Sequence, residues 1–395
     1  MNGEVAAQNL FGKNAKEAQK YFLENYWQKR PLLIRGAFPA GLSHVDPDSL
    51  AGLSCQAGID SRIVMEHGPD YPWQTRQGPF EEDVFESLPK THWTLLVQAV
   101  DRLVPEVAEV LEKFRFLPNW RLDDIMISYA ADHGSVGPHT DNYDVFLIQA
   151  MGKRKWDYSS LPMTVIEFEE GLDLKILKNF KADESFVLDE GDLLYLPPHV
   201  GHHGVAVGEC MTYSVGFRAP TQNEMLVSFA QFLMQAENPD EFFRDDTSSL
   251  LKRDQAGHGA LIREDREQLR ALMKKAIDDE SMFDRWVGAF LTEPRNFHDP
   301  NEDELDESGI LALLHREREV HKAEGGRYTY FESKGRIYFS VEGETLVVSP
   351  ELSGLVRMLC EENTWPTEKI LSFKASEGFS QILMHIWNQG YIRVD

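Results

Sequence analysis

The segment from Ser61 to Pro220 most constrains the fold of this chain. It contains short runs rich in β-branched and aromatic residues, separated by glycine, proline and aspartate turns. The runs are Trp93 to Val100, Ile125 to Ala130, Asp144 to Ala150, Ser185 to Leu188, Leu193 to Leu196 and Met211 to Phe217. So many short strands at this spacing predict a closed or double-sheet β architecture, such as a jelly roll. A helix from Lys13 to Tyr26 and a short strand from Leu32 to Arg35 precede them.

The pattern changes after Pro220, where apolar residues recur at helical spacing. The two stripes are Met225, Phe229, Phe232 and Leu233, and then Leu269, Leu272, Met273, Ala276 and Ile277. They predict a helical block from about 221 to 291. Between Glu293 and Ser308 lie two prolines and seven acidic residues, so this segment is too polar to be buried and is predicted to be a linker.

The last segment, Gly309 to Asp395, is small and mixed in character. Helices are predicted at Leu311 to His315, Leu352 to Glu361 and Phe379 to Trp387, and a hairpin at Arg327 to Phe331 with Arg336 to Val341. Helices beside a β-hairpin in so short a segment resemble a winged helix. That fold serves both DNA binding and protein contact.

Composition limits the partners and the compartment. The chain has 395 residues, which predicts two to three domains. Its 40 basic and 65 acidic residues give a formal charge of −25, which repels phosphate backbones and attracts a basic protein or peptide. The three cysteines form no CxxC pair, which favours a reducing cytoplasm. We expect no secretory signal, because Met1 to Lys13 shows no cationic start followed by an apolar run, and no membrane span, because no run of 18 apolar residues occurs.

A short motif between two predicted strands is the sharpest chemical feature. It reads Gly137-Pro138-His139-Thr140-Asp141 and opens a strand-like run from Asn142 to Ala150. Residues two apart on a strand point to the same face, so His139 and Asp141 direct an imidazole and a carboxylate to one point. A non-haem Fe(II) site needs two histidines and one carboxylate on one face. Such a pair also occurs as an ordinary surface hydrogen bond, so a third ligand has to decide between the two interpretations.

Candidates for the third ligand follow the predicted strand Leu193 to Leu196. The chain there reads Pro197-Pro198-His199-Val200-Gly201-His202-His203-Gly204. In an extended chain His202 and His203 face opposite ways, so only one of them can join the first two ligands. For the third metal ligand, the residue pattern slightly favours His202 over His203. His199 is the least favoured of the three because it lies beside the proline turn.

An oxygenase of this kind also binds a dicarboxylate, whose distal carboxylate needs a fixed guanidinium or ammonium group. The run Gly152-Lys153-Arg154-Lys155-Trp156 offers candidates on the next predicted strand. Arg154 and Trp156 share one face, and Lys153 and Lys155 share the other. Either Arg154 alone or a lysine would bind the cosubstrate. The alternative is a solvated basic strand edge.

Five segments carry a resemblance to a known family. They are Tyr26-Trp27-Gln28-Lys29-Arg30-Pro31, Gly137 to Phe146, Gly152 to Trp156, Tyr195-Leu196-Pro197-Pro198 and Tyr213 to Pro220. With them the chain resembles the JmjC-type ribosomal oxygenases, and within these the bacterial arginine 3-hydroxylases of ribosomal protein L sixteen. The resemblance extends over essentially the whole chain.

The resemblance implies the order of domains. A JmjC/cupin-type double-stranded β-helix would be followed by a helical dimerisation domain and a small C-terminal winged helix. The boundaries that we expect are 1–220 for the catalytic domain, 221–292 for the helical domain, 293–308 for the acidic linker and 309–395 for the winged helix.

The resemblance also implies the roles of site residues. His139, Asp141 and His202 would be the iron ligands and the catalytic residues. Arg154 would pair with the distal carboxylate of 2-oxoglutarate, and Ser128 would lie near that cosubstrate. Fe(II) would be the metal, with 2-oxoglutarate and dioxygen as cosubstrates.

The activity implied is 3-hydroxylation of an arginine side chain on a basic large-subunit ribosomal protein, by an enzyme that forms a homodimer. A target guanidinium needs an acceptor and a flat apolar wall, because an unpaired buried cation is very costly. Asp124 begins the strand that carries Ser128, and Tyr143 follows Asp141. We expect Asp124 to pair with the target charge and Tyr143 to pack against it. The alternatives are a turn residue and an ordinary core aromatic.

Two rival functions follow from the same residues. N-methyl demethylation uses the same iron chemistry, and a metal-binding β-domain fused to a winged helix could regulate transcription. Against DNA binding, the predicted helices of the winged helix carry few cations, with Arg357 in one and only His385 in another. We therefore expect no direct nucleic-acid binding and no membrane association.

Overall fold

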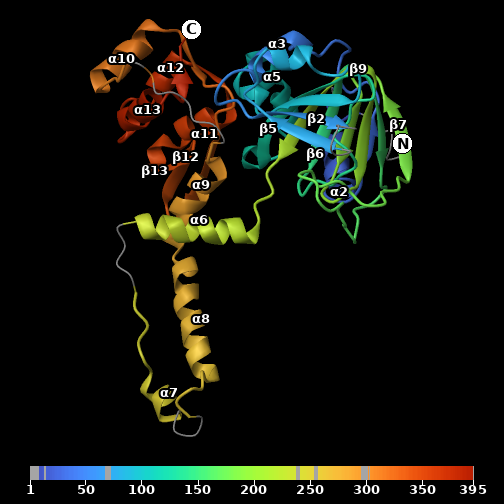
Figure 1. Cartoon of the computed structure of the whole chain (residues 1–395). Helices are drawn as coiled ribbons and strands as arrows, with labels where there is room; N and C mark the ends of the chain where they lie inside the picture. Colours follow the sequence, from blue (N-terminus) through green and yellow to red (C-terminus); the bar gives the residue numbers. More distant parts are fainter. Residues whose placement is uncertain are drawn as a thin grey trace. The chain divides into compact units, whose positions relative to one another are not determined.

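The computed structural model describes residues 9–12, 15–66, 73–236, 241–252, 257–294, 301 and 303–394. The chain divides into two compact units, Met1–Ala219 and Pro220–Asp395. Figure 1 shows that strands dominate the first unit, whereas helices dominate the second.

A nine-stranded antiparallel sheet forms the first unit. Its order is β1-β8-β6-β9-β5-β4-β2-β3, and β7 pairs with β6. The strands are β1 Leu32–Ile34, β2 Ser61–Glu66, β3 Trp73–Gln77, β4 Trp93–Val97, β5 Leu122–Ala130, β6 Val145–Tyr158, β7 Glu184–Leu188, β8 Leu193–Leu196 and β9 His202–Phe217. The predicted β-rich architecture is therefore confirmed.

Two strands are longer than predicted. Asp144 to Ala150 and the run around Arg154 were expected to be separate strands, but they form the single strand β6, which pairs with β9 along its length. The physical reason is a bulge, because the register shifts on both sides of Met151 and Gly152 adopts a φ of +63°. A Cβ on Gly152 would lie 2.2 Å from the Glu209 carbonyl oxygen. The bulge lets one strand bend and continue where the sequence suggested a break.

The start of each long strand also differs from the expected position. β6 begins at Val145 rather than at Asn142, and β9 begins at His202 rather than at Met211. Asp141 therefore lies in a loop, and the argument from strand alternation does not apply to it. His139 forms only an isolated bridge with His202.

Aromatic side chains fill the core beneath the sheet. Phe146 on β6 packs against Tyr195 on β8 with ring centroids 4.8 Å apart, and against Phe114 at 4.9 Å. Phe22, from helix α2 (Ala15–Asn25), joins them and is completely buried. Burying one such side chain stabilises a fold by about 2–3 kcal/mol. Helices α3 (Pro47–Ser54), α4 (Asp83–Glu86) and α5 (Pro105–Leu111) also belong to this unit.

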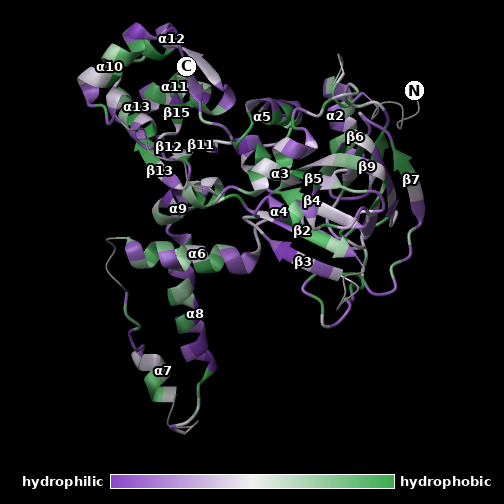
Figure 2. Cartoon of the chain, turned by 45° about the horizontal axis from the view of Figure 1, so that its top comes forward, coloured by the Kyte–Doolittle hydropathy of each residue, from purple (hydrophilic) through white to green (hydrophobic). Residues whose placement is uncertain are grey.

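The second unit begins with four helices, namely α6 Gln222–Gln235, α7 Thr247–Lys252, α8 Arg263–Asp278 and α9 Glu280–Thr292. Thr221 and Glu224 form a capping box that starts α6. Figure 2 shows both hydrophobic and hydrophilic residues along α8. Of the predicted linker 293–308, residues 295–300 and 302 lie outside the described residues.

The C-terminal part combines helices with two small sheets. The helices are α10 Glu307–Arg316, α11 Ser353–Glu361, α12 Thr367–Leu371 and α13 Phe379–Asn388. One sheet has the order β11-β12-β13 (Tyr328–Ser333, Arg336–Val341 and Glu344–Val348), and the other has β14-β10-β15 (Thr364–Pro366, Glu319–Lys322 and Ile392–Arg393). The predicted hairpin is β11 and β12. α9 packs closely on the β11-β12-β13 sheet. A Cβ on Gly288 of α9 would lie only 1.9 Å from the hydroxyl oxygen of Ser340 on β12.

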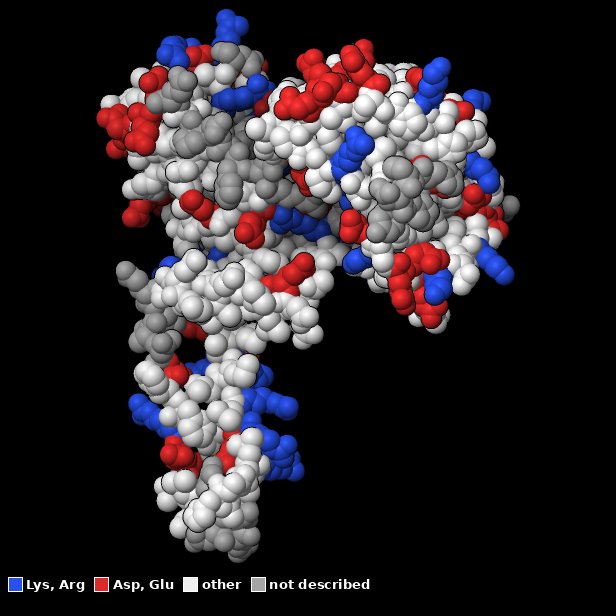
Figure 3. All heavy atoms as spheres, viewed as in Figure 1, with Lys and Arg blue, Asp and Glu red and all other residues white. Residues whose placement is uncertain are grey.

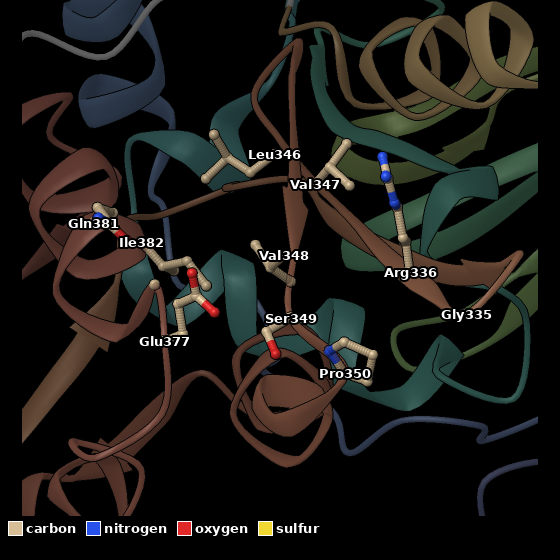
Figure 4. Close-up of a pocket in the computed structure, with 11 residues that line it drawn as sticks. Gly335, Arg336, Leu346, Val347, Val348, Ser349, Pro350, Glu377, Gln381 and Ile382 are labelled. Atoms are coloured by element: carbon tan, nitrogen blue, oxygen red, sulfur yellow. The ribbon is translucent and has the colours of Figure 1, made fainter.

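A hollow of about 740 Å³ lies between β13 and the start of α13. Figure 4 shows Leu346, Val348 and Ile382 along it, with Glu377 at one side and Arg336 at the other. Arg336 is its one basic lining residue. A single guanidinium does not make a binding site for a phosphate backbone.

None of the helices in the described part of the chain has the length and apolar character needed to span a membrane.

Candidate metal centre and active site

The backbone brings two distant segments together at the candidate metal centre. The His139 amide donates to the His202 carbonyl oxygen at 2.9 Å, and the His202 amide donates to the His139 carbonyl oxygen at the same distance. The His199 amide in turn donates to the Asp141 carbonyl oxygen at 2.8 Å. The loop before β6 is thus tied to the turn before β9.

The side chains of His139, Asp141 and His202 converge. Their ligand atoms all lie within 4.8 Å of one another, and they form the one such group of histidine, cysteine or acidic residues in the described ranges. One Asp141 oxygen lies 3.9 Å from His139 Nε2, and the other lies 3.6 Å from His202 Nε2. Two imidazoles and a carboxylate on one side of a point fit a divalent transition metal with open positions.

The two imidazoles are held in the form that binds metal. His139 Nδ1 is 2.9 Å from the Gly137 carbonyl oxygen, and His202 Nδ1 is 2.9 Å from the Val200 carbonyl oxygen. A carbonyl oxygen only accepts, so each Nδ1 carries the proton and each Nε2 directs its lone pair inward. Burial, reinforced by His139, lowers the pKa of His202 to about 4. His202 is therefore neutral at physiological pH and ready to bind a cation.

The other two histidines of the proline turn point elsewhere. His199 is exposed and has a φ of +64°. His203 is half-buried, and its Nε2 lies 3.0 Å from the Ser135 hydroxyl oxygen. Burial lowers the pKa of His203 as well. Of the three candidates left open by the residue pattern, only His202 places its imidazole beside the Asp141 carboxylate, with 3.6 Å between Nε2 and the nearer oxygen.

Arg154 lies behind the metal centre as a buried cation. It is 4% exposed, and its Nε and Nη2 have no hydrogen-bond partner in the part of the chain that the structure describes. Its guanidinium carbon is 5.7 Å from the Trp156 ring, which lies 5.8 Å from the His202 ring. An unpaired buried charge costs several kcal/mol. The site therefore fits an anion, such as the distal carboxylate of 2-oxoglutarate.

The neighbouring lysines are placed differently. Lys153 and Lys155 are exposed and form ion pairs with Asp189 at 2.8 Å and with Asp157 at 2.9 Å. Of the three basic residues in this run, only Arg154 has a buried side chain. The geometry therefore does not support a lysine as the residue that binds the cosubstrate.

The remaining predicted residues are more scattered. Ser128 is buried on β5, and its hydroxyl donates to the Thr212 carbonyl oxygen at 3.4 Å. Asp124 is 5% exposed, and one of its oxygens accepts from the Ala99 amide at 3.0 Å. Tyr143 is 41% exposed, on the loop that carries Asp141. These contacts leave the three predicted roles as predictions.

The sequence did not single out Gly204, which the site requires. Gly204 pairs with Trp156 across the two long strands, and a Cβ there would lie 2.7 Å from the Trp156 ring. The indole can occupy its place beside Arg154 and His202 only because this position has no side chain. A glycine within a β-rich run is the signal for such a close approach.

An antiparallel β unit with a His-Asp-His group and an unpaired buried arginine has the features of the Fe(II)- and 2-oxoglutarate-dependent oxygenases. The family model described as "JmjC domain" matches residues 109–225, and that described as "ROXA-like winged helix" matches residues 275–393. The predicted winged helix is confirmed.

Two curated relatives are similar over most of the chain. "Ribosomal protein uL16 3-hydroxylase" of Escherichia coli (strain K12) is 37% identical over 275 residues, which cover 70% of this chain and 71% of the relative. "Probable ribosomal oxygenase" of Haemophilus influenzae (strain ATCC 51907 / DSM 11121 / KW20 / Rd) is 32% identical over 266 residues, covering 67% and 65%.

Solved structures extend this similarity to nearly the whole chain. The X-ray structure of E. coli YcfD has a TM-score of 0.84 at 30% identity and covers 95% of this chain and 97% of its own. A structure of the E. coli ribosomal oxygenase YcfD with cobalt and 2-oxoglutarate has a TM-score of 0.80 at 32% identity and covers 94% and 96%. The chain belongs to the JmjC-type ribosomal oxygenase family.

Replacement of one histidine at a time tests the metal centre. His202→Ala removes a buried Nε2 ligand, and we expect Co²⁺ binding, followed by visible absorption, to be lost. His199→Ala is the matched control, because that side chain is exposed in the same turn. It should bind Co²⁺ like the unaltered chain. Equal binding by both variants would show that the centre has been placed wrongly.

Proposed function

We propose that this protein is an Fe(II)- and 2-oxoglutarate-dependent oxygenase that hydroxylates Cβ of an arginine side chain in a basic large-subunit ribosomal protein. The observation that carries the proposal is the His139, Asp141 and His202 group beside the unpaired guanidinium of Arg154. The name of the E. coli relative, a uL16 3-hydroxylase, supports the substrate class. The cytoplasm, where ribosomal proteins are found, is the expected compartment.

The chain's own residues would position the reactants. When bound, iron and 2-oxoglutarate let dioxygen oxidise an unactivated C–H bond, with succinate and carbon dioxide as coproducts. His139, Asp141 and His202 would hold the metal from one side, leaving the other positions open. Arg154 would bind the distal carboxylate of 2-oxoglutarate and thereby orient it. Trp156, whose ring lies 5.7 Å from the guanidinium carbon, would help to keep water from it.

The substrate would be attracted first by charge. The formal charge of −25 draws a basic protein, and Figure 3 shows acidic side chains in several clusters on one face of the molecule. Tyr143, exposed on the ligand loop, would pack against the target guanidinium. The pairing role of Asp124 requires that its buried carboxylate become accessible to the substrate.

The rival functions make different predictions. N-methyl demethylation would remove a methylene from the product, whereas hydroxylation adds an oxygen. A DNA-binding winged helix would present free cations on its helices, but Arg357 on α11 lies 3.0 Å from Glu361, and His385 on α13 lies 3.0 Å from Glu344. We therefore propose a role in protein contact for the winged helix, and no direct nucleic-acid binding.

Intact-mass analysis tests the activity directly. The unaltered chain is incubated with large-subunit ribosomal proteins, Fe(II), 2-oxoglutarate and air, and Asp141→Ala is the control. We expect a product about 16 Da heavier on one basic protein, because a ferrous oxygenase inserts one oxygen atom. The control should yield neither product nor substrate-dependent succinate. A loss of about 14 Da would favour demethylation instead.

Arg154→Met tests the cosubstrate site. It keeps a long side chain of similar length but removes the cation, so we expect KM for 2-oxoglutarate to rise by about 100-fold or more. Lys155→Met removes a cation from the exposed face of the same strand and should leave KM unchanged. Steady-state succinate formation measures both values. Equal KM values for the two variants would argue against the assignment of Arg154.

We further propose the domain boundaries stated above and a homodimer formed through the helical domain. α6 exposes Leu226, Val227 and Met234, and α8 exposes Leu269, Met273 and Ile277, with Met234 87% and Met273 73% exposed. Contiguous apolar surface of this kind marks an interface. Light scattering should give twice the chain mass of 45.2 kDa. A single-chain mass at micromolar concentration would contradict the dimer.

A further inference from the structure

A buried polar network lies at the end of the loop that carries Asp141. Its centre is Asp144, whose side chain is completely buried immediately before β6. One carboxylate oxygen accepts from the Tyr195 hydroxyl at 2.6 Å. The other accepts from Gln28 Nε2 and from Arg121 Nη2, each at 3.1 Å. None of these three partners is a candidate metal ligand.

The partners of Asp144 are themselves fixed. Arg121 Nε donates to the Arg218 carbonyl oxygen at 2.7 Å, and its guanidinium lies 5.5 Å from the Trp27 ring. The Gln28 amide donates to the Tyr195 hydroxyl oxygen at 2.7 Å, in a turn where Gln28 has a φ of +56°. Burial and the Asp144 charge raise the pKa of Tyr195 far above its ordinary value, so the phenol stays a donor.

The backbone of Asp144 is fixed as well. Its carbonyl oxygen accepts from the Phe217 amide at 3.1 Å, at the far end of β9. Upstream, the reciprocal bonds between His139 and His202 fix the loop at the near end of β9. Residues 140–143, among them Asp141, span the distance between these two fixed points, and within the span the Asp141 carbonyl oxygen accepts from the His199 amide at 2.8 Å. The orientation of the Asp141 carboxylate therefore depends on all three contacts.

We propose that Asp144 is a positioning residue, which holds the downstream end of the ligand loop so that Asp141 faces the two histidines. This inference rests on the proposed function only in taking Asp141 as a metal ligand. It assigns a purpose to Gln28 and Arg121, which lie far from the metal ligands in sequence. It also explains why a charged pair is buried here: Asp144 and Arg121 neutralise each other while the carboxylate accepts three hydrogen bonds.

Asp144→Asn tests this role with little change in volume. The new amide group cannot accept all three of these hydrogen bonds, because one of its two ends is an NH2 donor, and Arg121 loses its counter-charge. The probe is Co²⁺ alone, titrated into the full-length chain at a temperature well below the Tm of each variant. We expect the Kd for Co²⁺ to rise by about 10-fold or more, as for other residues that orient metal ligands from behind. An unchanged Kd would overturn the proposal.

Two further variants separate positioning from stability. Leu50→Ala removes completely buried apolar volume on α3 in the same unit, so it should lower Tm without moving the Kd for Co²⁺. Combining Asp144→Asn with Arg121→Gln replaces the unpaired cation by an amide pair and should recover part of the affinity. A rise in Kd for Leu50→Ala that matches the one for Asp144→Asn would reduce the effect to stability and overturn the proposal.

If Asp144→Asn does not fold, Tyr195→Phe takes its place, because it removes one hydrogen bond and keeps the ion pair. The Kd for Co²⁺ should rise by a smaller factor, and no rise would overturn the proposal. The test does not involve a ribosomal substrate. An unaltered chain that binds Co²⁺ but hydroxylates nothing therefore contradicts the proposed function and leaves the positioning role standing.

Discussion

The site depends on one pair of hydrogen bonds, those exchanged by the backbones of His139 and His202. They join the loop before β6 to the start of β9, which are far apart in sequence. Through them, two imidazoles reach a common point with their ring centroids 4.2 Å apart. In the folded chain β9 also pairs with β5 and with β6, so the convergence of the three side chains rests on the same sheet.

The long strands explain why the pairing is so well fixed. β6 crosses the sheet as one strand, pairing with β8 through its first half and with β7 through its second. The bulge at Gly152 turns the strand between these halves. As a result Phe146 enters the aromatic core while Arg154 reaches the anion site. One strand thus supplies both the packing that stabilises the unit and the cation that would bind the cosubstrate.

The sequence predicted the fold class and the position of most strands, because alternating apolar runs report burial directly. β8 was predicted at its observed bounds, and the ligand residues were found as a motif. The bulge was not predicted, because a glycine reads as a break until its partner strand is known. The choice among His199, His202 and His203 depended on family resemblance, since side-chain direction at a turn follows from tertiary contacts. Asp144 was noticed only within a longer motif, because its partners come from three other segments.

Arg121 and Arg154 in the first unit show opposite uses of the same side chain. Arg121 meets a carboxylate, a carbonyl oxygen and an aromatic ring, so its charge is compensated within the fold. Arg154 meets the Trp156 ring, and two of its nitrogens have no partner in the described chain. The unpaired buried cation lowers the stability of the folded chain, and an anion that binds to it would stabilise the folded chain by its binding free energy. Arg121, whose charge is compensated, holds segments of the fold together, whereas the uncompensated guanidinium of Arg154 stays available to an anion such as a carboxylate.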